Sequence, residues 1–204
     1  MLEAQHLAAQ RGATTLFAGV DFTLARGEVL LVTGANGSGK TTLLKMVAGL
    51  AHPAAGDLAW QGAARLPFDA ETRATTLYIG HAPALKDELT AEENLRSLAM
   101  LHGGTAEPAA VRDALRAWTL DAQRALPARV LSQGQRRRVG LARLRLVRRP
   151  LWVLDEPTTA LDAAGIATLQ NELGAHLDQG GVAIVATHHP LALREGTWRT
   201  LQLQ

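Results

Sequence analysis

Residues 34–41 read GANGSGKT, which matches the phosphate-loop pattern G-x-x-x-x-G-K-[ST]. They directly follow the apolar run Val29–Val32, which the sequence predicts to be a buried strand. In such a loop the glycines let backbone N–H groups surround phosphate oxygens, and the lysine adds a positive charge. A helix expected at about Lys40–Leu50 would also direct its dipole at a phosphate. A glycine-rich turn without a ligand is the alternative, and the preceding strand argues against it.

The residues expected to hold the nucleotide come from this loop and the first turn of the helix. The Thr41 hydroxyl is also placed to ligate Mg²⁺. The predicted nucleotide-binding residues are Gly34, Asn36, Gly37, Ser38, Gly39, Lys40, Thr41 and Thr42.

Composition limits the class of protein without adding chemistry. The chain has 204 residues, 47% of them hydrophobic, so one domain, or one domain with an inserted lobe, can bury a full core. Its formal net charge of +2 is weak support for nucleic acid binding, and the absence of cysteine excludes disulfides and thiolate metal sites. No apolar stretch approaches the ~20 residues that span a bilayer, and a signal-peptide pattern is missing. We therefore expect a soluble chain that reaches a membrane only through a partner.

Hydrophobic patterns divide the chain into sheet-forming and helix-forming stretches. Alternation predicts a small antiparallel sheet that the run at 57–60 rejoins. The runs at 151–154 and 182–185 are apolar on both faces, which is typical of central parallel strands. Helical patterns dominate between them, including a capping box at Thr90 and Glu93 and a helix after Pro108. We expect a single domain over 1–204 with an inserted helical subdomain at about 84–150. The alternating residues are Leu2, Ala4 and His6, then Val20, Phe22 and Leu24.

Four further motifs follow the phosphate loop in a fixed order. Residues 131–135 read LSQGQ, Asp155 and Glu156 end an apolar run, residues 160–162 read ALD, and His188 follows the run at 182–185. With the phosphate loop, this series resembles the motifs of ATP-binding-cassette ATPases, with Gln133 in place of the usual glycine. The resemblance implies an α/β fold, a P-loop NTPase (RecA-like) parallel sheet core with an N-terminal antiparallel β-subdomain and an inserted helical subdomain. It also implies an enzyme that hydrolyses ATP with Mg²⁺.

The resemblance implies a role for each motif residue. Glu156 would polarise the attacking water, and His188 would hydrogen-bond the γ-phosphate. Lys40 would add a positive charge at the phosphates, Thr41 would ligate Mg²⁺, and Asp155 would bind Mg²⁺ through water. The signature residues Ser132 and Gly134 would act on ATP held by a second protomer, so ATP would join a homodimer. Gln135 and the D-loop residue Asp162 would also belong to the nucleotide-binding residues. Ser132 with Gln135 is also a capping box, and Asp162 equally suits the N-cap of the next helix.

Two positions depart from the family pattern. His81 stands where these ATPases usually have a glutamine that senses Mg²⁺ and the membrane partner, which puts direct metal coupling in doubt and could add pH sensitivity. Arg11, before Gly12, stands where an aromatic ring often stacks on adenine. An arginine plane can also stack on a base, and the alternative is a solvated loop arginine with Phe17 in the core.

The run Arg136–Arg138 invites a nucleic-acid interpretation. On a helix, however, these side chains spread around the cylinder, and apolar residues interrupt the later arginines. We expect a solvated, salt-bridged or membrane-proximal helix and no nucleic-acid partner.

At the subfamily level, residues 131–144 (LSQGQRRRVGLARL), Gly80 with His81, and 151–162 (LWVLDEPTTALD) closely resemble the ATP-binding subunit of the haem exporter of bacterial cytochrome c maturation. That resemblance implies a peripheral ATPase on the cytoplasmic face of the inner membrane, integral-membrane permease partners, and an indirect link to a haem chaperone. No haem-ligand motif accompanies the seven histidines. Another small exporter, a soluble cassette acting on ribosomes or DNA, and a non-catalytic regulatory module are the alternatives.

Overall fold

The structure, a computed structural model, describes all residues from Met1 to Gln204. The chain forms two compact units that share its length discontinuously. The first comprises Met1–Tyr78, Arg149–Glu156 and Gly174–Gln204, and the second comprises Ile79–Arg148 and Pro157–Leu173. The subdomain limits expected at about 84–150 stay a prediction. None of the helices has the length and apolar character needed to cross a bilayer.

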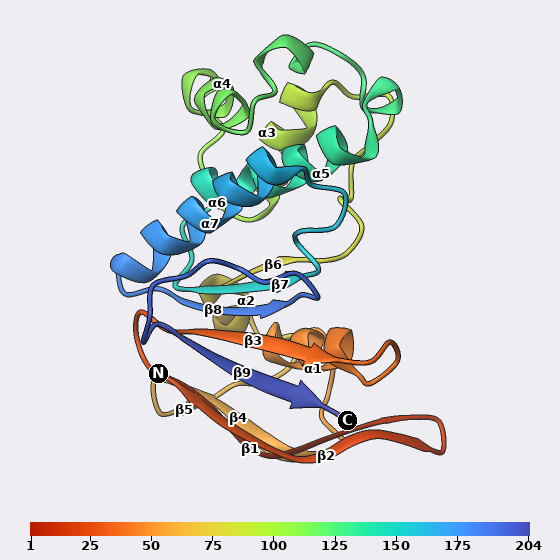
Figure 1. Cartoon of the computed structure of the whole chain (residues 1–204), viewed down its shortest axis with the longest axis vertical. Helices are drawn as coiled ribbons and strands as arrows, with labels where there is room; N and C mark the ends of the chain where they lie inside the picture. The colour runs from red at the N-terminus through yellow and green to blue at the C-terminus, as the bar shows by residue number, and fades with distance from the viewer. The chain divides into compact units, whose positions relative to one another are not determined.

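An antiparallel sheet opens the first unit, in the order β2-β1-β4-β5 (Figure 1). The strands are β1 (Leu2–Arg11), β2 (Thr14–Leu24), β4 (Ala55–Trp60) and β5 (Ala63–Ala64). Strand β4 pairs with β1, with Leu2 opposite Trp60 and Ala4 opposite Leu58. The expected sheet, rejoined by the run at 57–60, is therefore present.

The alternation predicted for β1 is wrong at His6. Leu2, Ala4 and Leu7 are buried, whereas His6 is exposed and has a φ of 50°. The pairing of β1 with β2 shifts register between Ala4 and Leu7, as expected where a bulge adds a residue to one strand. The His6 backbone N–H donates to the Asp21 carboxylate at 2.6 Å, so this N–H has a hydrogen-bond partner although the strand pairing is interrupted there.

A second sheet has the order β6-β7-β8-β3-β9 (Figure 1). Its strands are β6 (Thr76–Ile79), β7 (Leu151–Asp155), β8 (Val182–Ala186), β3 (Val29–Gly34) and β9 (Trp198–Leu203). Strand β3 is parallel to both β8 and β9, and β7 is parallel to β8. Every residue of β7 and β8 is buried, which explains their uninterrupted apolar sequence.

Helix α1 (Lys40–Val47) joins the two sheets into one core. Leu43, Leu44 and Val47 of the helix belong to the same buried cluster as Leu7 and Ile184. The helix ends three residues before the expected Leu50, because the Leu50 N–H bonds back to the Lys45 carbonyl around Gly49, whose φ is 72°. This is the Schellman arrangement, in which glycine adopts the left-handed conformation at low cost. A short helix, α2 (Ala70–Thr75), precedes β6.

The second unit consists of helices and two 3-10 turns, Asp121–Gln123 and Ala128–Val130. The helices are α3 (Ala91–Leu101), α4 (Pro108–Ala117), α5 (Gln133–Leu141) and α6 (Arg143–Leu146). The predicted capping box at Thr90 and Glu93 begins α3. Val111, Leu115 and Trp118 are buried as expected for one apolar face. Helix α7 (Ala163–Asp178) begins in the second unit and ends in the first.

Candidate functional site

The phosphate loop leaves β3 at Gly34 and enters α1 at Lys40. Gly34 has a φ of 144°, and a Cβ there would lie 2.4 Å from the Leu203 carbonyl oxygen of β9. Gly39 has a φ of 97°, and a Cβ there would lie 2.8 Å from the Phe17 ring. Both positions therefore need glycine for conformation and for space. Phe17 is buried in the core, as in the alternative in which Arg11 is solvated and does not stack on adenine.

Lys40 is held inside this loop. Lys40 is only 8% exposed, and its ammonium group donates to the Gly34 carbonyl at 2.7 Å and to the Ala35 carbonyl at 3.0 Å. The Ser38 hydroxyl is buried nearby in the loop and has no hydrogen-bond partner. A buried hydroxyl without a partner is costly, so this position suits a polar ligand oxygen.

Two oxygen groups suited to a hard cation meet behind the loop. The Thr41 hydroxyl donates to Asp155 Oδ2 at 2.9 Å, and Asp155, the last residue of β7, is only 2% exposed. Mg²⁺ prefers oxygen ligands and keeps waters and phosphate oxygens in its shell, so one hydroxyl and one carboxylate are enough protein ligands. The residues predicted for the metal therefore fit it.

Glu156 and His188 leave neighbouring strands and form a pair. The Glu156 N–H donates to the Ala186 carbonyl at 2.9 Å, and Glu156 has a φ of 48°. A left-handed conformation is uncommon at a non-glycine residue, and strained backbone of this kind clusters at functional sites. His188 Nε2 lies 3.3 Å from Glu156 Oε1, with side chains 50% and 18% exposed. The pair thus joins a nearly buried carboxylate to an accessible imidazole.

The signature residues lie in the second unit at the start of α5. The Ser132 hydroxyl accepts from the Gln135 N–H at 3.2 Å, and Gln135 Oε1 accepts from the Ser132 N–H at 2.9 Å. This capping box leaves other N–H groups of the first turn facing outward, where the helix dipole favours an anion. A Cβ on Gly134 would lie 2.7 Å from the Ala160 carbonyl oxygen, so glycine lets the loop at 160–162 contact the helix directly.

Asp162 is the N-cap of α7. Its carboxylate accepts from the Gly165 N–H at 2.8 Å and is paired with Arg138 of α5. The Gly165 N–H, followed by the Arg138 guanidinium, lowers the pKa of the Asp162 carboxyl. The alternative that Asp162 is the N-cap of this helix is confirmed. The sequence does not predict its contact with Arg138, because it does not show which arginine of the run faces which loop.

Of the remaining predicted residues, four are exposed and Thr42 is partly buried. Asn36 and Gly37 are exposed at the tip of the loop, and Arg11 is exposed at the end of β1. His81 is exposed in the second unit, and its carbonyl accepts from Arg137 at 3.1 Å.

The arginine run is neither a free basic patch nor a wholly solvated face. Arg136 is paired with Asp87 and Arg138 with Asp162, while Arg137 is buried. Arg136 and Arg138 therefore form the ion pairs expected of a salt-bridged helix. The sequence pattern does not predict that Arg137 is buried.

Comparisons with known proteins identify the family of this chain. The family model described as "ABC transporter" matches residues 17–159. The chain belongs to the ABC transporter family. The chain is thus an ABC ATP-binding cassette, a class of ATP-hydrolysing enzymes, and the predicted family and ATPase class are confirmed.

Curated relatives of the cassette share most of its length. The cytochrome c biogenesis ATP-binding export protein CcmA of Aromatoleum aromaticum is 51% identical over 92% of this chain and 88% of its own. The protein of the same name from Dechloromonas aromatica is 44% identical over 100% of both chains.

Solved structures share the fold of the cassette. A putative ABC transporter ATP-binding protein from Pyrococcus furiosus aligns with a TM-score of 0.84 at 25% identity, covering 99% of this chain and 96% of that one. A dimeric ATP-binding cassette bound to ADP and Pi aligns with a TM-score of 0.77 at 23% identity, covering 93% of this chain and 88% of that one. The predicted fold class is confirmed.

Proposed function

We propose that this cassette is the ATP-hydrolysing subunit of a cytochrome c maturation complex. It would lie on the cytoplasmic face of the bacterial inner membrane, bound to integral-membrane permease subunits. ATP hydrolysis there would drive release of the haem-loaded chaperone or export of haem. The observation that carries this proposal is the 44% identity, over the whole of both chains, to a relative named for cytochrome c biogenesis and export.

The arrangement of the first unit supports a role for each predicted residue in binding. Lys40 would exchange its bonds to the Gly34 and Ala35 carbonyls for phosphate oxygens, because a charge-assisted bond to phosphate is stronger than one to a neutral carbonyl. The partnerless Ser38 hydroxyl and the backbone of Gly37 and Gly39 would complete the phosphate contacts. When bound at Thr41 and Asp155, Mg²⁺ would neutralise charge on the phosphates.

For hydrolysis, we assign Glu156 as the group that accepts the proton of the attacking water. Its carboxylate is largely shielded from solvent, and His188 at 3.3 Å fixes its orientation and is accessible enough to reach the γ-phosphate. Ser132, Gly134 and Gln135 would complete the site from a second copy of the chain, so a closed pair of cassettes would form only with ATP bound.

The test is a pull-down with tagged Glu156→Gln protein and Mg-ATP from detergent-solubilised membranes of the source cells, followed by mass spectrometry. The proposal expects a small integral-membrane subunit together with cytochrome c maturation proteins, recovered with ATP and lost in the Glu156→Gln/Lys40→Ala control. Recovery of an unrelated permease would replace the cargo and keep the ATPase. Ribosomal or DNA-bound partners without a membrane protein would overturn the transport role.

A further inference from the structure

The segment Gly80–Asp87, which carries His81, connects β6 to α3 and is attached at both ends to α5. At its first end, Arg137 Nη1 donates to the Gly80 carbonyl at 2.8 Å and to the His81 carbonyl at 3.1 Å. Arg137 Nε also donates to the Pro157 carbonyl at 3.3 Å, and Pro157 follows Glu156 directly in the chain. Arg137 is only 3% exposed, so these carbonyls take the place of its hydration shell.

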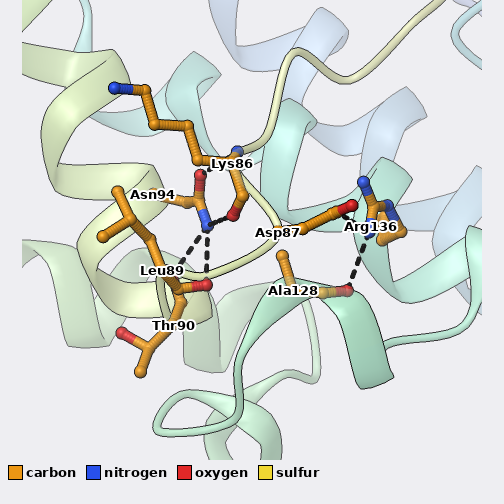
Figure 2. Close-up of polar contacts among 7 residues, drawn as sticks. All are labelled: Lys86, Asp87, Leu89, Thr90, Asn94, Ala128 and Arg136. Atoms are coloured by element: carbon orange, nitrogen blue, oxygen red, sulfur yellow. Dashed lines mark hydrogen bonds and ion pairs between the residues drawn. The ribbon is translucent and has the colours of Figure 1, made fainter.

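At the other end, Arg136 bridges two elements (Figure 2). Its Nη1 donates to Asp87 Oδ1 at 2.6 Å and to the Ala128 carbonyl at 2.9 Å. The Asp87 side chain is about half exposed, and exposed ion pairs contribute little to stability. A planar guanidinium that contacts two acceptors nevertheless fixes their geometry more narrowly than a lysine would.

Asn94 keeps the loop around Asp87 in one shape (Figure 2). Its Oδ1 accepts from the Lys86 N–H at 2.8 Å, and its Nδ2 lies 3.0 Å from each of the Lys86, Leu89 and Thr90 carbonyl oxygens. Asn94 is only 2% exposed, at the start of α3. The loop therefore presents Asp87 to Arg136 from a fixed backbone, and a displacement of this loop is passed to α5 through the ion pair.

We infer that Arg136 and Arg137 are positioning residues that couple the His81 segment to the Ser132 end of α5. The inference rests on the proposed function, in which Ser132 and Gly134 meet ATP held by a second cassette. The arginines lie one turn or so after Ser132, so a shift in their anchors tilts the N–H groups of the first turn of α5. ATP binding to a single cassette does not involve that turn and stays unchanged.

The test uses the partly exposed ion pair, because replacing the buried Arg137 risks unfolding the unit. Three proteins are compared with the wild type: Arg136→Asp, Asp87→Arg, and the double charge swap. We expect Arg136→Asp to lower kcat about fivefold or more and to weaken ATP-dependent dimerisation in a Glu156→Gln background by a similar factor. The Kd of the single cassette for ATP stays within about twofold, and the double swap recovers most of the lost kcat.

The matched control is the exposed Arg116–Asp113 pair of α4, which has the same chemistry and lies in the same unit but joins two residues of a single helix. Arg116→Asp should leave kcat within about twofold of the wild type. Thermal unfolding confirms that each variant is folded. If the wild type hydrolyses ATP and Arg136→Asp has the same kcat, the inference alone is overturned. A double swap that recovers none of the lost kcat would also overturn the inference alone. A wild-type protein that neither binds nor hydrolyses ATP would overturn the proposed function and the inference with it.

Discussion

The ammonium group of Lys40 bonds to two carbonyls of its own loop, and the proposed function places a phosphate of ATP in that loop. Replacing Lys40 by alanine removes charge-assisted bonds that contribute about 1.5–3 kcal/mol each. We therefore expect Lys40→Ala to weaken ATP binding by about 10- to 100-fold or more while the protein stays folded. Titration calorimetry with Mg-ATP measures the affinity.

Lys45 provides the matched control for this substitution. It is exposed on the same helix, so Lys45→Ala should leave the ATP affinity within about twofold. Equal affinities in Lys40→Ala and the wild type would show that the loop is not the nucleotide site.

A partly buried histidine, His176, makes stability depend on pH. The His176 ring stacks on Trp152, with centroids 3.8 Å apart and planes 5° apart, and its Nε2 lies 3.2 Å from the Val182 carbonyl oxygen. Burial lowers the pKa of His176 to about 4. Because the folded-state pKa lies below the ordinary value near 6.5, the unfolded state binds the proton more tightly. The free energy of unfolding should therefore decrease as pH falls from about 6.5 to 4, by up to about 3 kcal/mol.

The measurement is urea unfolding followed by tryptophan fluorescence at several pH values in this window. His176→Phe keeps an aromatic ring against Trp152 and removes the titrating group, so the pH dependence should flatten. His189, which is exposed, serves as the control, and His189→Gln should keep the wild-type slope. An unchanged slope in His176→Phe would refute the role of His176.

At the scale of elements, two helices of the second unit begin with the same device. Thr90 with Glu93 caps α3, and Ser132 with Gln135 caps α5. Aspartate also caps well, so Thr90→Asp and Ser132→Asp should each change stability by less than about 1 kcal/mol. Only Ser132 is proposed to face a phosphate, and a carboxylate there would repel it. We expect Ser132→Asp to lower kcat at least about 100-fold and Thr90→Asp to change it less than about twofold.

Steady-state ATPase assays and thermal unfolding of the two variants separate capping from phosphate binding. A comparable loss of kcat in both would mean that the capped helix ends matter only for folding.

Local signals predict much of this fold, and tertiary contacts decide the rest. The buried runs of β3, β7 and β8, the Thr90 capping box and the phosphate loop each carry their information within a few neighbouring residues. His6 departs from its alternation because a bulge in β1 depends on the partner strand. The burial of Arg137 follows from carbonyls more than 50 positions distant at Gly80 and His81, which no local pattern contains. The contact of Arg138 with Asp162 likewise joins residues that are far apart in the sequence, so no local pattern predicts it.

At the scale of the whole molecule, the predicted site residues are divided between two compact units. The phosphate loop, Asp155, Glu156 and His188 belong to the first unit, and Ser132, Gly134 and Asp162 belong to the second. Our account requires two copies of the chain, each supplying one set to the same ATP. ATP binding would then favour the dimer, and hydrolysis would weaken it, which gives a motion that a membrane partner could use.

The most direct measurement is the molar mass of Glu156→Gln protein in solution with saturating Mg-ATP, by light scattering after size exclusion. Without the group proposed to accept the water proton, ATP should persist, and the account predicts a mass of twice the 21.7 kDa chain with ATP and the single-chain mass with ADP. The Glu156→Gln/Lys40→Ala protein should stay at the single-chain mass in both nucleotides. A single-chain mass for Glu156→Gln under saturating Mg-ATP would contradict the shared site.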